Sequence, residues 1–207
     1  MIIKYIDAAN EEVTLEQASK LNEYSIVYLV NDKPKKGEHF KDGKLTSIYY
    51  TRDENETDAE ILREQASKGV SIAIMERNSL ENGHDFIKSM IYDASGVLIM
   101  KFNSLYDENN ELLAEEHFDP ETGQPNYAET VKFFYNREMD PEKQVFEGRY
   151  KPDGSLDYIR YHNSSDPLNF LENGTPGLED IPTLCERAGT TMEQIGYYLT
   201  AEILPNK

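Results

Sequence analysis

Four histidines, His39, His84, His117 and His162, are the side chains best suited to acid–base chemistry near neutral pH. No two of them stand at a metal-ligand spacing such as His-x-x-x-His. His39 and His84 lie close to phenylalanines at matching points of a sequence repeat, so a paired site is one interpretation. The other interpretation, which we favour, is that these are strand-end histidines whose hydrogen bonds are satisfied by neighbours.

A denser group of ionisable residues is Glu115-Glu116-His117-Phe118-Asp119. It would form a general acid–base site if a neighbouring strand brought another carboxylate close. Because side chains alternate between the faces of a strand, Glu115 and His117 share one face and Glu116 takes the other. We therefore expect a solvated strand face.

The preceding segment, Asp107-Glu108-Asn109-Asn110-Glu111, resembles a calcium loop. It lacks the glycine and the distal bidentate glutamate of an EF-hand, which predicts a polar turn instead. The chain also has no Walker loop, no Gly-x-Gly-x-x-Gly and no Gly-x-Ser-x-Gly. We accordingly predict no catalytic residues, no cofactor and no metal site, and an enzyme with an unrecognised site stays an alternative.

The single cysteine, Cys185, excludes an intrachain disulfide, and we expect a buried, inert thiol on a helix. The first residues, Met1–Asp7, lack the basic start, apolar run and small-residue cleavage site of a signal peptide. No stretch approaches the ~20 apolar residues of a membrane span. These features predict a cytoplasmic protein.

The charge is strongly acidic, with 21 Lys and Arg against 39 Asp and Glu, a formal net charge of −18. Such a chain is repelled by nucleic-acid phosphates and anionic membranes and is attracted to basic proteins. Residues 91–150 carry 13 acids and 5 bases, whereas residues 32–44 hold five lysines and three acids. An acidic partner-binding face and a surface that only keeps the protein soluble are both open interpretations.

An internal duplication organises the first half of the chain. Glu16–Lys20 recurs as Glu64–Lys68, and each copy precedes an apolar run, at 26–30 and 71–75. Gly37-Glu38-His39-Phe40 then corresponds to Gly83-His84-Asp85-Phe86. We predict a repeated helix–strand–strand unit within about 14–90, with each apolar run a central strand covered on both faces.

Local signals support the helices of this unit. Thr14 with Gln17 and Thr57 with Glu60 fit the capping box, in which two side chains satisfy free backbone N–H groups. Gly69 fits the residue that ends a helix in a left-handed conformation.

A β-meander is predicted over about 85–162, because aromatic residues there are repeatedly followed by turn residues. The junctions are Tyr92–Gly96, Tyr106–Asn110, Phe118–Gly123, Tyr135–Pro141 and Tyr150–Gly154, with an earlier one at Phe40–Gly43. The expected strands are 85–92, 97–105, 112–118, 128–135, 143–150 and 156–162.

The remaining chain is expected to be a loop around Asn173–Gly177 and a helical segment of about 177–203, in which 190–203 is either helix or strand. There is no convincing linker, so we predict one α+β domain over 1–207. Its core is a mainly antiparallel β-sheet meander with flanking helices.

Part of the meander resembles two families of tandem hairpin repeats. Phe146–Gly154 is similar to a MORN-type repeat, and Tyr92-Asp93, Tyr106-Asp107 and Phe118-Asp119 are similar to the steps of YD repeats. Both resemblances imply a sheet surface used for scaffolding or partner contact.

Residues 184–195 resemble the helix–turn–helix element of bacterial repressors. Its second helix would present Glu193, Tyr197 and Tyr198, with no Lys or Arg before Lys207. Because recognition helices need cations for phosphate and guanine contacts, we predict two packed elements and no nucleic-acid binding.

The overall profile resembles the immunity proteins of bacterial polymorphic toxin systems, which are small, acidic, cytosolic proteins that bind and block a toxin. This resemblance implies a non-enzymatic inhibitor of a basic protein partner. A scaffold module that uses its sheet for self-association is the alternative. The predicted partner-binding residues belong to the densest acidic stretch, and they are Tyr106, Glu108, Glu111, Glu115, Glu116, Phe118 and Asp119.

Overall fold

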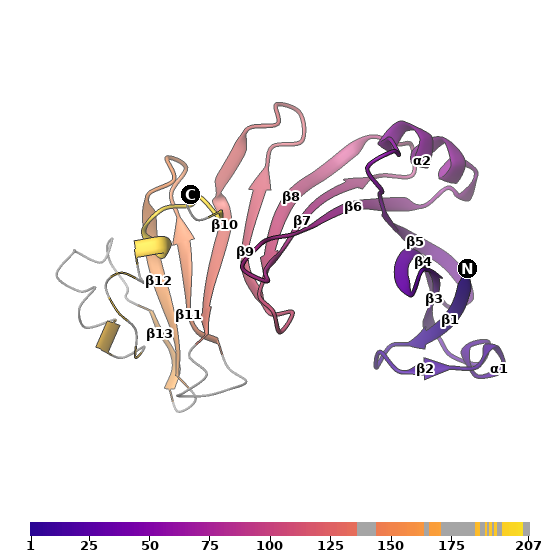
Figure 1. Cartoon of the computed structure of the whole chain (residues 1–207), viewed down its shortest axis with the longest axis horizontal. Coiled ribbons are helices and arrows are strands. Elements are labelled where there is room, and N and C mark those ends of the chain that lie inside the picture. Colours follow the sequence, from indigo (N-terminus) through magenta and orange to yellow (C-terminus); the bar gives the residue numbers. More distant parts are fainter. Residues whose placement is uncertain are drawn as a thin grey trace. The chain divides into compact units, whose positions relative to one another are not determined.

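A computed structural model of the chain describes residues 1–135, 144–163, 166–170, 185, 186, 189, 191, 193 and 196–204 (Figure 1). The chain divides into two compact units, which are described separately. Unit 1 comprises residues 1–78 and 87–101, and unit 2 comprises residues 79–86 and 102–207. Strands dominate, helices are few and the pairing is mostly antiparallel, so the predicted α+β class is confirmed. The organisation as one domain stays a prediction.

Unit 1 is a sheet that carries short helices, in the strand order β2-β1-β3-β4-β5-β6-β7-β8. Strands β7 and β8 contribute residues to both units. The elements are β1 (Ile2–Asp7), β2 (Glu12–Val13), α1 (Leu15–Ala18), β3 (Glu23–Val30), β4 (Lys33–Lys41), β5 (Lys44–Thr51), α2 (Asp58–Gln65), η1 (Ala66–Lys68), β6 (Ser71–Ser79), β7 (Asp85–Tyr92) and β8 (Leu98–Tyr106).

Both predicted capping boxes are confirmed. Thr14 caps α1 and Thr57 caps α2, and in each box the side chain three residues on accepts a hydrogen bond from the cap's own backbone N–H. Gly69 follows η1 with a φ of 64°, the left-handed conformation expected of a helix-terminal glycine. Helix α2 then packs Ile61 against Ile48, Ile72 and Ile74 of β5 and β6, which forms the core of unit 1.

The sequence repeat has the same element order in both copies, α1–β3–β4 and α2–β6–β7, but its anchors are not equivalent. Gly37 lies inside β4, because β3 and β4 are joined by a tight turn at Asn31 and Asp32, both with positive φ. Gly83, by contrast, lies in the turn before β7, with a φ of 83°. The turn of the hairpin therefore comes later in the second copy of the repeat than in the first.

The two apolar runs also differ from the prediction in their surroundings. In β6, Ile72 and Ile74 are buried beneath α2. In β3, which lies between β1 and β4, no residue is fully buried. The two copies of the repeat differ because α1 has only four residues and buries Ala18 alone, too little apolar surface to cover a strand. Strand β6 also pairs in parallel with β5, since α2 connects them as a crossover.

Unit 2 is an antiparallel meander in which strand order follows chain order. After the shared strands, its elements are β9 (Leu112–Phe118), β10 (Pro125–Tyr135), β11 (Gln144–Tyr150), β12 (Leu156–Asn163), β13 (Asp166–Phe170) and the 3₁₀ turn η2 (Tyr197–Leu199). The predicted strands 85–92 and 112–118 match β7 and β9, and the other four differ by at most three residues at an end. The junction at 136–141 lies outside the described residues.

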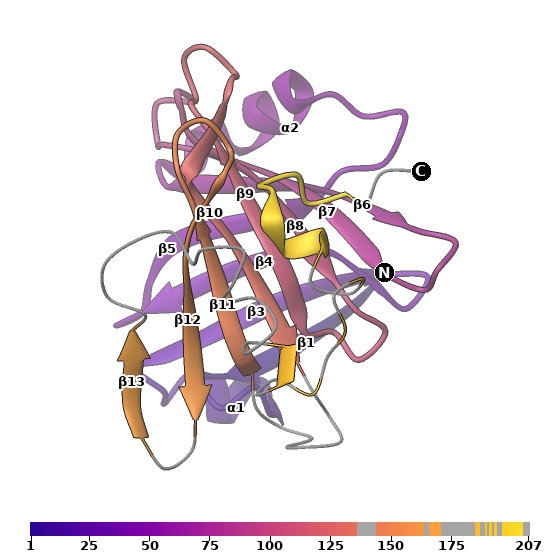
Figure 2. The same ribbon diagram turned by 90° about the vertical axis from the view of Figure 1, so that its left-hand side faces the viewer.

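The segment of residues 196–204 packs against one face of this meander, and Figures 1 and 2 draw it in yellow. Tyr198 stacks edge-on against Phe134 and Phe146, and Ala201 donates its N–H to the carbonyl of Gly154. Thr200 forms an isolated bridge with Ser155. In the described part of 190–203, Glu193 and Gly196 are helical, Tyr197–Leu199 form a 3₁₀ turn and Thr200 forms the bridge.

Cys185 belongs to the same core and is buried, as predicted. Cys185 and Glu186 are helical, within the helical segment predicted for 177–203. Residues 178–184, 187 and 188 of that segment lie outside the described residues, as do the loop at 173–177 and most of the helix–turn–helix resemblance. Within the described part of the chain, no helix is both long enough and apolar enough to span a membrane.

Candidate functional site

The predicted partner-binding residues are distributed over β8, β9 and the two turns that flank β9. Tyr106 ends β8, Glu108 and Glu111 lie in the turn after it, and Asp119 opens the turn after β9. The first turn is organised by Asp107, whose Oδ1 accepts the backbone N–H groups of Asn109 and Glu111. This is the polar turn predicted in place of a calcium loop. Among the described residues, no group of three or more His, Cys, Asp and Glu is arranged to hold a metal ion.

Strand alternation separates the acidic residues of β9 as predicted. Glu115 and His117 lie on one face, with 2.7 Å between Glu115 Oε1 and His117 Nε2. The imidazole of His117 stacks on Phe102 of β8 at a ring-centroid distance of 5.6 Å. Glu129 of β10 supplies a second carboxylate, with its Oε2 3.7 Å from His117 Nδ1. We call Phe102, Glu115, His117 and Glu129 the acidic face.

Glu116 lies on the opposite face of β9. Its carboxylate accepts a hydrogen bond from Asn103 at 3.3 Å, and burial raises the pKa of this group. Phe118 has the same parity in β9 and is directed to that face as well. The seven predicted residues therefore do not form one surface, and a partner on the acidic face would contact Glu115 but not Glu116.

Two of the seven residues, Glu108 and Asp119, are exposed, and they have different local roles. Asp119 accepts hydrogen bonds from the backbone N–H groups of Thr122 and Glu121 and from the Thr122 hydroxyl. These bonds, led by that from the Thr122 backbone, lower the pKa of Asp119. Asp119 is thus a turn-forming residue, whereas the turn that contains Glu108 is held by hydrogen bonds to the carboxylate of Asp107. Partner binding by these residues stays a prediction.

The histidines at the repeat anchors are satisfied by local neighbours. His39 lies in β4, with its Nδ1 3.1 Å from Ser25 Oγ and its Nε2 3.2 Å from Glu23 Oε1. His84 precedes β7, and Asn82 lies 3.1 Å from its Nδ1. These contacts agree with the favoured interpretation of structural histidines. His162 lies in β12, and its side chain is outside the described set.

Sequence reasoning missed an ion-pair network in unit 1. Arg52, just after β5, bridges Asp58 of α2 and Glu76 of β6, and Tyr92 of β7 donates its hydroxyl to Asp58 at 2.7 Å. Hydrogen bonds from Asn78, Lys88 and Arg52, in that order, lower the pKa of Glu76 to about 2. No sequence motif indicates this network, since residues that contact each other within it are up to 34 residues apart.

The network borders a polar hollow of about 490 Å³. Its lining consists of charged and amide side chains from the ends of β5 and β6 and the segment between them: Arg52, Asp53, Glu54, Glu56, Glu76, Arg77 and Asn78. Lys35 also pairs with Asp53 and Glu56. Carboxylates that line the hollow already bind Arg52 and Lys35. Their role is therefore to hold β5, α2 and β6 together.

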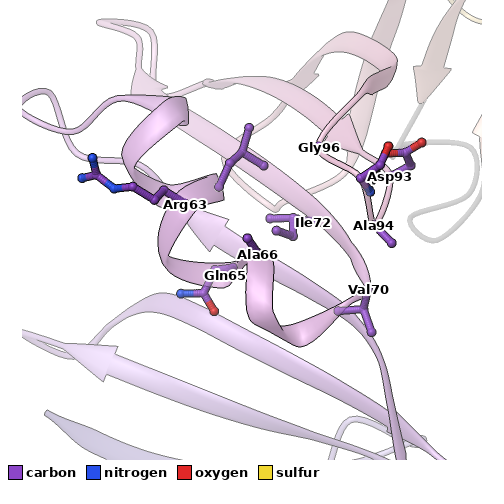
Figure 3. Close-up of a pocket in the computed structure, with 10 residues that line it drawn as sticks. Arg63, Gln65, Ala66, Val70, Ile72, Asp93, Ala94 and Gly96 are labelled. Atoms are coloured by element: carbon purple, nitrogen blue, oxygen red, sulfur yellow. Dashed lines mark hydrogen bonds between the residues drawn. The ribbon is translucent and has the colours of Figure 1, made fainter.

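A second hollow, of about 250 Å³, lies between α2, β6 and the turn at 93–96 (Figure 3). Leu62, Ala66, Val70 and Ile72 make much of its lining apolar. Gln65 Oε1 is buried without a hydrogen-bond partner among the described residues. Gln65 also lines the hollow, and Figure 3 draws its amide pointing away from the turn at 93–96.

The second feature that sequence reasoning missed is Lys132, which is completely buried in β10 of unit 2. Its Nζ donates hydrogen bonds to the carbonyls of Tyr197 and Glu202 in the 196–204 segment. One signal was present: Lys132 interrupts the apolar run Val131-Lys132-Phe133-Phe134, where a solvent-facing lysine would be unexpected beside a buried core.

Comparison with protein-family models, with curated proteins and with solved structures gives no match to this chain.

Proposed function

We propose that this protein binds a basic protein partner and neutralises it without catalysing a reaction, as immunity proteins of bacterial toxin systems do in the cytoplasm. The observation that carries this proposal is the uneven charge of the two units. Unit 1 holds 16 acidic and 13 basic residues, a net charge of −3, whereas unit 2 holds 23 acidic and 8 basic residues, a net charge of −15. Unit 2 is therefore the part expected to attract a cationic surface.

The acidic face supports this role at the level of contacts. It combines carboxylates with an aromatic surface, because Phe102 stacks on His117, which in turn contacts Glu115 and Glu129. Carboxylates of this kind steer a basic partner and fix its orientation, and aromatic side chains supply contact area. Glu129 is 63% exposed, so its charge is available to a partner.

The experiment is an affinity purification from cells of the source organism with the tagged full-length protein, at low and then moderate salt. We expect one basic protein at near-stoichiometric yield, with weaker retention at moderate salt because screening reduces charge steering. A variant with Glu108, Glu121 and Glu129 changed to Lys should lose that protein. All three side chains are exposed in unit 2, so the fold should tolerate the changes.

The matched control changes Glu11, Glu54 and Glu64 to Lys. These glutamates are exposed in unit 1, and the change in net charge is the same. The control should retain the partner. Equal losses in both variants would show that total charge, and not unit 2, determines binding. Recovery of the bait alone, or of a self-associated form, would contradict the inhibitor proposal and favour a scaffold.

A further inference from the structure

Lys132 occupies a position in β10 whose neighbours on both sides are small. In the strand register it is opposite Ala114 of β9 and opposite Gly148 of β11. A Cβ at Gly148 would lie 3.2 Å from the Tyr150 hydroxyl, so the tyrosine already packs closely against the glycine. The two small residues leave room for the long lysine side chain above the sheet, beneath the 196–204 segment.

The segment closes over Lys132 through several contacts. The lysine Nζ lies 2.7 Å from the Tyr197 carbonyl oxygen and 3.7 Å from the centroid of the Tyr197 ring. Tyr150 donates its hydroxyl to the Tyr198 carbonyl at 3.0 Å. Near the other end of the segment, Ile203 packs with Leu105 and Ala114 of the sheet. The closed segment therefore removes both the lysine and an aromatic cluster from water.

Burial without a directly paired carboxylate is costly for an ammonium group. Desolvation lowers the pKa of Lys132 from 10.5 to about 7, although the charges of Glu202 and Glu116 act in the opposite direction. A neutral amine still has two N–H groups, which is the number that the Tyr197 and Glu202 carbonyls require. The closed segment consequently retains both hydrogen bonds when the lysine loses its proton.

We propose that the 196–204 segment is a latch on unit 2 that closes more tightly as the solution becomes more alkaline, because closure encloses the amine of Lys132 between the sheet and the carbonyls of Tyr197 and Glu202. When the latch opens, Lys132 reaches water and takes up a proton. Opening also uncovers the aromatic side chains of Phe146 and Tyr150, which lie in the core beneath the segment.

The sign of the pH dependence follows from the two states of the lysine. The open state binds a proton up to pH values near 10.5, whereas the closed state releases it near pH 7. Between these values the open state holds more protons, so raising the pH favours closure by about tenfold per pH unit. Below pH 7 both states are protonated, and this contribution to the closing equilibrium becomes constant.

The other ionisable groups that face Lys132 among the described residues are Glu116 from β9, Tyr150 from β11, and Tyr197 and Glu202 from the segment. Burial raises the pKa of Tyr150 and of Tyr197 further above 10, so both phenols stay neutral below pH 9.5. Glu116 and Glu202 are retained in a variant of Lys132, so any pH dependence that they cause persists in that variant, and the part due to the lysine is lost.

Hydrogen exchange of the Ala201 amide in the full chain measures latch opening, because this N–H donates to Gly154 only when the segment is closed. From pH 7.5 to 9.5, the exchange rate divided by the intrinsic rate should fall about a hundredfold. Amides of β11 in the same unit should be more strongly protected than Ala201 at every pH, since they open only with the sheet. In Lys132→Met, which has similar length and no titrating group, Ala201 protection should be independent of pH.

A second measurement uses the unaltered protein and does not depend on the variant's folding. The ¹³Cε chemical shift of Lys132 should titrate with a midpoint near 7, far below that of an exposed lysine. Titration of Lys132 near pH 10.5 would overturn the proposal. So would Ala201 protection that is flat with pH in the unaltered protein, equally steep in Lys132→Met, or indistinguishable from that of the β11 amides.

Discussion

At the scale of single residues, Gly37 shows how one close contact constrains the sheet of unit 1. Gly37 in β4 is directly opposite Tyr49 in β5, and the tyrosine ring occupies the space where a side chain would begin. A Cβ at residue 37 would lie 1.9 Å from Tyr49 Cε1, so alanine cannot be accommodated unless the ring moves. The sequence repeat marks Gly37 as an anchor, but the need for glycine at this position comes from the Tyr49 ring on the neighbouring strand.

We expect Gly37→Ala to lower the free energy of unfolding by about 1–3 kcal/mol, the usual cost of overpacking. Urea unfolding followed by circular dichroism measures this. In a Tyr49→Ala background the ring is gone, so the same substitution should cost clearly less. An equal cost in both backgrounds would mean that the ring does not determine the need for glycine.

Residue-scale chemistry was the least predictable part of the molecule. The faces of Glu115, Glu116 and His117 followed from strand alternation, because that rule is local. The proximity of Glu129 to His117 depends on the β9–β10 register, which shifts between Asn126 and Val131. The contacts of Lys132 reach 65 and 70 residues along the chain, and no local pattern specifies them.

At the scale of elements, helix α2 completes the core of unit 1. Its Ile61 is buried against β5 and β6, whereas the four-residue α1 buries only Ala18. Both helices begin with the same capping box. The contribution of each cap to the free energy of unfolding should therefore depend on what its helix packs against.

Thr57→Ala removes the hydroxyl that accepts the Glu60 N–H, and we expect it to destabilise the protein by about 1 kcal/mol. Thr14→Ala, the matched change in α1, should cost less because little of the core depends on that helix. Chemical denaturation of both variants provides the comparison. A larger loss for Thr14→Ala would contradict this account of α1 and α2.

Element boundaries were predicted well where turn chemistry is local. Strands β7 and β9 were predicted to the residue, because an aromatic residue before an Asp-containing turn marks each strand end. The parallel pairing of β5 with β6 was not predicted, since the choice between a hairpin and a crossover is made by how α2 packs on the sheet. The repeated peptides likewise gave no indication that the two hairpins turn at different points of the repeat.

At the scale of the whole molecule, the distribution of charge is the main functional indication. The sequence predicts an acidic stretch within residues 91–150. The division into units adds that most of the net charge belongs to unit 2. The acidic face and the 196–204 latch both belong to that unit. They lie on opposite faces of its strands, because Glu115 and Lys132 have opposite parity in the β9–β10 register.

Hydrogen exchange of the affinity-purified complex, read by mass spectrometry against the free protein, tests most directly whether unit 2 binds a basic partner. We expect slower exchange in residues 102–135, which include the acidic face, and unchanged exchange in residues 1–78. Slower exchange confined to residues 1–78, with 102–135 unaffected, would contradict the assignment of partner binding to the acidic unit.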